Sequence, residues 1–295
     1  MSAFTLWGVF PIYFRALQSV PTFEILCHRI FWSVLSLAVF LILFTRLSGL
    51  KQMFSRPKLL MGLALSAVLI ASNWLTYIWA ISVHRALETS LGYFINPIVS
   101  IILGMLILKE RLKPIQLTAV IIALIAVAIL TISYGSFPWI AFTLAFTFGF
   151  YGLVRKLLAV DPMNGLFVES LLLFPLAVAA LLFMNHQGSL AYLSNGSMVT
   201  ALLTLAGIVT VIPLWLFVVA AKRLNLSTVG FLQYIAPTLQ FLIAVFVFKE
   251  PFTSLHLLVF GLIWFALALY SLDSIIRRNG DVIQKPISLF VDTER

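Results

Sequence analysis

The stretch from residue 24 to residue 32 combines several ionisable side chains within an apolar segment. Glu24, His28 and Trp32 are spaced four residues apart and therefore share one helix face, with Arg29 beside them. Ionisable residues inside a membrane helix are expensive and indicate function. Because histidine exchanges protons near neutral pH, we predict Glu24, His28, Arg29 and the intramembrane Glu169 as proton-coupling candidates. A structural ion-pair network near the outer interface accounts for the pattern equally well.

A second set of polar residues surrounds a motif that the chain contains twice. The first copy ends in Asn96-Pro97 and the second in Ala236-Pro237, and 140 residues separate the two prolines. Each copy runs on through an apolar stretch to a Lys-Glu pair at 109–110 or 249–250, which we interpret as boundary charges. A proline inside a helix frees the carbonyl four residues earlier. We therefore predict helix kinks at Pro97 and Pro237.

The side chains around these prolines predict a substrate path. Broken backbone at membrane depth is tolerated only where protein or a water-filled cavity meets it. Helical spacing places polar residues on shared faces in both copies and in the segment from 59 to 81. The substrate-path candidates are Asn73, Tyr77, Thr89, Tyr93, Asn96, Ser100, Gln233 and Gln240. The alternative is that these groups join neighbouring helices by hydrogen bonds.

The composition places these residues in an all-α integral membrane protein. Of 295 residues, 62% are hydrophobic and 10% are charged, whereas soluble domains have about 25% charged residues. A membrane-spanning helix needs about 20 apolar residues. Breaks at charged, Pro and Gly clusters give ten transmembrane helices near 2–17, 23–45, 59–81, 86–108, 114–133, 137–154, 164–184, 198–221, 226–248 and 253–274.

The distribution of basic residues predicts the orientation of these helices. Of the 19 Lys and Arg residues, about 15 lie in alternate loops and the C-terminal tail, among them Arg155 and Lys156. The positive-inside rule then places both termini in the cytoplasm. Because five helices per half is an odd number, the second half enters the membrane inverted, as in many secondary transporters. We predict two inverted five-helix repeats at 1–134 and 135–276, joined near 134–136, and a polar tail at 277–295.

Other sequence features limit the function classes. The net charge of +9 is distributed over short loops, which favours topology signals over nucleic-acid binding. There is no Walker-type loop, no H-E-x-x-H pair and no G-x-S-x-G elbow, and the four histidines lie on separate segments, so we expect no metal, no cofactor and no enzyme. The single Cys27 lies in an apolar segment, and residues 2–17 are predicted as a first span rather than a cleaved signal peptide. The segments 114–133 and 253–274 are apolar nearly all round, which predicts contact with the lipid bilayer or a homodimer surface.

Several motifs, in this order along the chain, resemble the RarD group of the EamA family in the drug/metabolite transporter superfamily. They are Glu24-Ile25-Leu26 with His28-Arg29, then Asn73-Trp74-Leu75, Leu91–Pro97, Lys109–Leu112 and Phe148–Lys156. The resemblance implies a ten-helix permease of the bacterial inner membrane with its substrate path near the axis between two inverted repeats. Relative to that family the chain begins late, within the first predicted span, and its second proline lacks the preceding asparagine.

We therefore predict a secondary transporter that moves small metabolites or drug-like molecules by alternating access. Coupling to protons is left open, because a facilitator would need no titratable group. A membrane-embedded enzyme acting on lipid is a first alternative, but it would need a convergent nucleophile or acid/base set. A non-transporting scaffold is a second alternative, which would not need matched prolines in both halves.

Overall fold

The computed structural model describes residues 1–43, 50–83, 85–133, 138–247 and 254–283, and every regular element within them is helical. The elements are α1 (Ser2–Gly8), α2 (Phe10–Ala16), α3 (Thr22–Leu43), α4 (Leu50–Phe54), α5 (Pro57–Ser82), α6 (Ala86–Leu106), α7 (Pro114–Ser133), α8 (Trp139–Leu157), α9 (Pro162–His186), α10 (Ser197–Arg223), α11 (Leu226–Gln233), α12 (Ile235–Leu242), the π-helix η2 (Ile243–Val247) and α13 (Ser254–Ile283).

The helix starts repeat along the chain at the interval seen between the two prolines. The helices α3, α5, α6 and α7 each begin 140 residues before α9, α10, α11 and α13, respectively. Several of these starts have local causes. Pro57, Pro114 and Pro162 occupy first helical positions, where a missing N–H costs nothing. Asp161 caps α9 by accepting hydrogen bonds from the backbone N–H groups of Met163 and Asn164.

The chain is a multi-pass membrane protein. Seven helical stretches among the described residues are long and apolar enough to cross a membrane, and they lie in α3, α5, α7, α8, α9, α10 and the run from α11 to η2. The helices α6 and α13 contain shorter apolar stretches, Gly92–Leu106 and Leu257–Tyr270. The first predicted span is two helices of seven residues each, α1 and α2. Ten crossings therefore stay a prediction.

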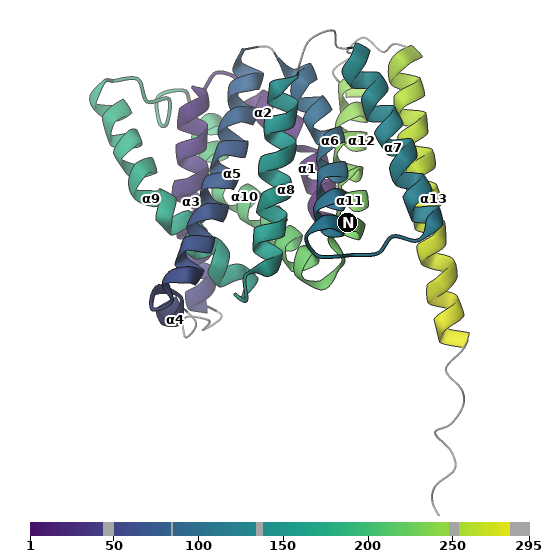
Figure 1. The fold of residues 1–295 in the computed structure, drawn as a ribbon. Helices are drawn as coiled ribbons and strands as arrows, with labels where there is room; N and C mark the ends of the chain where they lie inside the picture. The colour runs from purple at the N-terminus through teal and green to yellow at the C-terminus, as the bar shows by residue number, and fades with distance from the viewer. Residues whose placement is uncertain (44–49, 84, 134–137, 248–253, 284–295) are drawn as a thin grey trace, which may run out of the picture.

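Figure 1 shows the long helices running alongside one another, with α3 and α9 at one edge of the bundle and α7 and α13 at the other. The helix α7 packs against α13 through small residues such as Ala119, Ala123 and Ala266. Their outer faces expose apolar side chains, including Ile125 and Phe265. Between the two edges, α6 contacts both α8 and α11.

The two proline-containing segments differ. The helix α6 continues without interruption through Pro97, whereas the second copy is divided at Tyr234 into α11 and α12 and ends in the π-helix. The span predicted at 226–248 is one apolar stretch, Leu226–Val247, whose helix is interrupted at Tyr234. The kinks at Pro97 and Pro237 stay predictions. The two segments also touch: a Cβ atom at Gly230 would lie 2.7 Å from the carbonyl oxygen of Pro97, so this approach requires glycine.

Other boundaries differ from the sequence prediction. The helix α13 continues to Ile283 and so passes the boundary at 277 where we predicted a polar tail. The short helix α4 occupies part of a segment predicted as a loop. The joint predicted at 134–136 and the second Lys-Glu pair at 249–250 lie outside the described residues.

Candidate functional site

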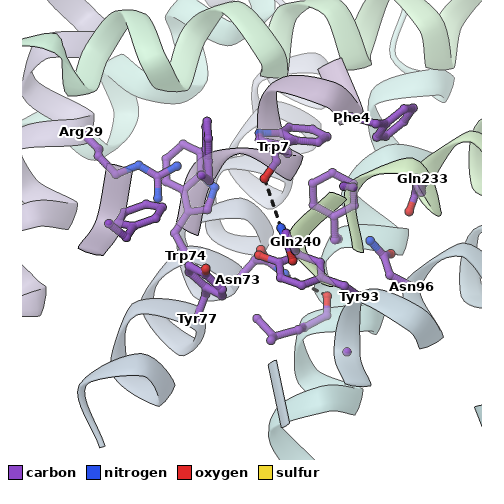
Figure 2. A pocket seen from close by; sticks show the side chains of 16 residues that line it. Phe4, Trp7, Arg29, Asn73, Trp74, Tyr77, Tyr93, Asn96, Gln233 and Gln240 are labelled. Atoms are coloured by element: carbon purple, nitrogen blue, oxygen red, sulfur yellow. Dashed lines mark hydrogen bonds between the residues drawn. The ribbon is translucent and has the colours of Figure 1, made fainter. Parts of the chain in front are cut away.

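A cavity opens between α1–α2, α3, α5, α6, α8 and the divided α11–α12 segment (Figure 2). Its empty space is about 730 Å³, which includes the open mouth. It is lined by Phe4, Trp7, Phe10, Phe14, Arg29, Asn73, Trp74, Tyr77, Gly92, Tyr93, Asn96, Leu144, Phe148, Gln233, Ala236 and Gln240. Of the eight predicted substrate-path residues, six line this cavity. Thr89 and Ser100 are buried but do not line it.

The four lining amides differ in how fully the protein satisfies them. Asn73 donates to the carbonyl oxygen of Leu144 at 2.9 Å and to Thr147 Oγ1 at 3.0 Å. Gln240 donates to the Trp7 carbonyl oxygen at 3.1 Å, which joins α12 to α1. Gln233 donates to Ser100 Oγ at 3.1 Å and thereby links the two repeated segments, so Ser100 supports the site from behind.

Asn96 is the amide that the protein leaves least engaged. Among the described residues neither its Oδ1 nor the Oε1 of Gln233 has a hydrogen-bond partner, although both atoms are buried. A buried polar atom without a partner costs about 1–3 kcal/mol. The two oxygens are therefore buried acceptors that the described protein leaves unsatisfied.

Aromatic side chains form most of the remaining cavity wall. The rings of Tyr77 and Tyr93 lie 5.7 Å apart, and those of Trp7 and Phe148 lie 5.4 Å apart. The contribution of the first segment was missed in the sequence prediction. Its signal was the spacing of Phe4, Trp7, Phe10 and Phe14 by three or four residues, which places them on one side of a helix.

The four predicted proton-coupling residues do not form one cluster. Glu24 is fully buried and faces the connection between α9 and α10, where its two carboxylate oxygens accept from the backbone N–H groups of Ala191 and Tyr192 at 2.9 and 2.8 Å. His28 Nε2 lies 3.7 Å from Glu24 Oε1, and its ring lies against Tyr192 with 4.6 Å between centroids. Neither residue lines the cavity. The geometry makes Glu24 the anchor of this connection.

Arg29, one residue further along the same helix, turns to the cavity instead. Its Nε–H donates to Thr210 Oγ1 on α10 at 3.0 Å. Its guanidinium carbon lies 4.3 Å from the centroid of the Trp74 ring and 5.6 Å from that of Phe14. Both contacts are at cation–π distance.

Glu169 lies apart from the cavity and pairs with a second buried arginine. Arg155 Nη1 donates to Glu169 Oε1 at 3.1 Å, Arg155 Nη2 donates to the Pro162 carbonyl oxygen at 3.1 Å, and Ser66 donates to the same carboxylate. Arg155 has no exposed surface. It was counted as a loop charge in the sequence analysis, and the structure corrects this: it lies in the last turn of α8 and is covered by α9.

Glu110 is more than the boundary charge that we predicted. Its carboxylate accepts from the backbone N–H groups of Leu226 and Ser227 at 2.7 and 2.9 Å and from Ser227 Oγ at 2.7 Å. These N–H groups begin α11 and have no partner within the helix. Glu110 therefore caps the second proline-containing segment from the end of the first.

Comparison with known proteins identifies the family of the chain. The model of the EamA-like transporter family matches residues 1–132 and again residues 137–272. The chain belongs to the EamA-like transporter family. The resemblance stated from the sequence motifs is thereby confirmed.

EamA-family relatives match the chain along most of its length. Protein RarD of Escherichia coli is 45% identical over 276 residues, which cover 93% of both chains. An uncharacterized transporter of Vibrio cholerae is 44% identical, covering 93% of this chain and 91% of its own, and one of Pseudomonas aeruginosa is 45% identical, covering 93% and 92%.

One protein of known crystal structure has the same fold as this EamA-family chain. The TM-score is 0.69 with 16% sequence identity, and the match covers 92% of this chain and 95% of the other. At this identity the likeness concerns the fold alone. The relatives named as transporters and the cavity thus point to transport, and what is transported must be inferred from the cavity itself.

Proposed function

We propose that the protein is a secondary transporter that moves small metabolites or drug-like molecules across the bacterial inner membrane by alternating access. The observation that supports this most directly is the cavity, because both halves of the chain contribute to it. Residues before 134 provide Arg29, Asn73 and Asn96, and residues after 135 provide Gln233 and Gln240. Binding sites between two repeats are typical of secondary transporters.

Helix packing supports a two-fold relation between the two repeats, and inversion rests on the predicted odd number of helices per half. Adding 140 to the residue numbers of α6 gives the segment of α11 and α12, and subtracting 140 from those of α8 gives the segment of α1 and α2. The helices α6 and α8 pack together, and so do their counterparts α12 and α1. The same exchange relates α5 and α8 to α10 and α1, and α3 and α10 to α9 and α5. Three pairs, α3 with α9, α6 with α11 and α7 with α13, map onto themselves. Such exchange is expected of a two-fold axis between halves, and two separate matches to the family model agree with it.

Transport can be tested with the purified protein in liposomes. We expect time-dependent, saturable uptake of compounds from a metabolite panel, with none in protein-free vesicles. Asn96→Ala removes the least engaged amide and should lower uptake at least severalfold in a normally folded protein. Asn185→Ala removes an exposed amide on α9 and serves as the matched control. Equal loss in both variants, or none in Asn96→Ala, would remove Asn96 from the substrate path.

Proton coupling is tested in the same vesicles. Glu24, His28 and Glu169 lie outside the described cavity lining. A proton bound to one of them would therefore affect substrate binding by changing the packing of the helices and not by direct contact. A pH gradient across the vesicle should accelerate uptake if one of these groups is coupled. Equilibration that is independent of the gradient would identify a facilitator.

Orientation is tested by labelling single cysteines in a Cys27→Ser background. We expect both termini in the cytoplasm, which places Gln187 at the outer side and Lys58 at the inner side. Both side chains are exposed. A membrane-impermeant maleimide should label Gln187→Cys in right-side-out vesicles and Lys58→Cys only after permeabilisation. The opposite pattern would invert the proposed topology.

A further inference from the structure

Arg29 is a cation held at membrane depth. It lies seven residues into α3, or about 10 Å along the helix from its start at 1.5 Å per residue. Only 5% of its surface is exposed. An arginine at the centre of a membrane helix costs about 2.5–3.5 kcal/mol even by insertion scales that report small values. A charge in this position therefore needs compensation.

The described protein supplies little compensation for this charge. The Nε–H of Arg29 donates to the neutral hydroxyl of Thr210, and among the described residues neither Nη nitrogen has a hydrogen-bond acceptor. No ion pair of the described side chains involves Arg29. None of the other described lining residues is charged. Stacking on Trp74 offsets part of the cost, because cation–π contacts contribute about 0.5–2 kcal/mol.

The guanidinium geometry identifies the missing partner. Arginine presents N–H donors in a planar fork that matches the two oxygens of a carboxylate. The guanidinium carbon lies 4.3 Å from the centroid of the Trp74 ring, and the hydrogen bond to Thr210 uses only Nε, so the Nη groups can serve a ligand in the cavity. A cationic ligand would instead meet an unscreened like charge at this end of the cavity.

The rest of the lining specifies the body of the ligand. In Figure 2, Arg29 lies at one end of the lining and Asn96 and Gln233 at the other, with Trp7, Trp74 and Tyr93 between them. Aromatic walls favour a flat apolar body. At the far end, the amide side chains of Asn96 and Gln233 line the cavity and make this end polar.

We propose that the cavity binds an organic anion whose acidic group pairs with Arg29, whose flat apolar body lies among the aromatic rings, and whose far end is polar and lies against the amides of Asn96 and Gln233. This substrate class rests on the proposed transport function, because the bound anion is taken to be the transported molecule. Binding of the anion can nevertheless be measured without transport. The two ideas can therefore fail independently.

Probes that share one aromatic body and carry an anionic, a neutral or a cationic end group test the proposal on the wild-type protein. The probes are 4-hydroxyphenylacetate, its neutral amide 4-hydroxyphenylacetamide and the amine tyramine, with phenylacetate and indole-3-acetate as further flat carboxylates. Titration calorimetry with protein in lipid nanodiscs gives each affinity. We expect at least one carboxylate to bind roughly ten- to hundredfold more tightly than the amide of the same body, and tyramine to bind least. Absence of binding by every carboxylate at millimolar concentration, or equal binding of acid and amide, would overturn the proposal.

Arg29 variants identify the group responsible for the preference. Arg29→Gln should remove the difference between acid and amide, and Arg29→Lys should keep part of it because the charge remains while the planar fork is lost. Size-exclusion chromatography shows whether the variants fold. If they do not fold, the affinities of the wild-type protein for the acid and for the amide still test whether the cavity prefers an anion. A preference for acid that survives in folded Arg29→Gln would assign the anion to another residue.

Transport measured separately distinguishes this inference from the proposed function. Carboxylates that bind but do not cross the membrane would contradict transport while leaving the binding site intact. Saturable uptake of amines or neutral compounds, without uptake of organic anions, would uphold transport and reject the substrate class.

Discussion

Two arginines are buried in the part of this membrane protein that the structure describes, and their surroundings differ. Arg155 has a carboxylate partner in Glu169, a backbone carbonyl in Pro162 and no exposed surface. Arg29 has one neutral acceptor and two aromatic rings, and it borders the cavity. A charge that the protein neutralises itself holds helices together. A charge left without a counter-ion beside a cavity is available to a ligand, so burial alone does not distinguish a structural ion from a functional one.

The largest effect should follow from breaking the internal pair. Arg155→Met leaves Glu169 buried without its counter-ion, and we expect a loss of about 3–5 kcal/mol in the free energy of unfolding. Unfolding of the detergent-solubilised protein, followed by its melting temperature and by denaturant titration, measures this. The double variant Arg155→Met/Glu169→Leu should recover much of the loss. Simple additivity of the two single variants would show that the pair is not coupled.

The next effect concerns a carboxylate satisfied by a helix terminus. Glu110→Ala removes three hydrogen bonds from the start of α11. We expect about 1–3 kcal/mol of destabilisation, smaller than for Arg155→Met because the variant leaves neutral N–H groups unpaired and no buried charge without its counter-ion. Hydrogen exchange at Leu226 and Ser227 should rise in this variant while exchange in α9 does not change. Uniform acceleration throughout the protein would contradict a local cap.

Local features of this protein could be predicted from its sequence, whereas contacts between distant segments could not. Helix starts and six cavity residues could be predicted, because proline positions, helical spacing and the 140-residue repeat are local patterns. The pairing of Glu110 with α11 could not be predicted, because its partners lie 116 and 117 residues away in sequence. Nor could the sequence separate Glu24 from Arg29, which are five residues apart but face an interhelix connection and the cavity, respectively.

The burial of Arg155 also could not be predicted from the sequence. A basic residue beside Lys156 resembles an ordinary cytoplasmic loop charge, and counting it as one gave a consistent topology. The fold buries it because α9 turns back over α8 after a short connection and brings Gly165 against the guanidinium. A Cβ atom at Gly165 would lie 2.2 Å from Arg155 Nη1, so the absence of a side chain there makes the room. Such complementarity depends on tertiary packing.

A smaller effect is expected at Thr210, the hydrogen-bond acceptor of Arg29 among the described residues. Thr210→Val keeps the shape of the side chain and removes the oxygen that accepts from Nε. We expect a loss of about 1 kcal/mol in stability, at the lower end of the cost of an unpaired buried donor, because Arg29 can turn further toward the cavity. Melting temperature and the affinity for 4-hydroxyphenylacetate should be measured together. A loss as large as that of Arg155→Met would show that Thr210 stabilises the charge as strongly as a carboxylate does.

The smallest change in stability is expected for Arg29→Met, and it bears most directly on the comparison. Removing Arg29 leaves no described carboxylate without a partner, and methionine retains contact with Trp74 and Phe14. Replacing an uncompensated buried charge with an apolar side chain is often neutral or stabilising. We therefore expect stability within about 1 kcal/mol of wild type, together with loss of carboxylate binding. The same substitution at 155 is the matched control. If Arg29→Met destabilised the protein as much as Arg155→Met, Arg29 would be a structural ion. The described cavity lining would then no longer explain a preference for anions.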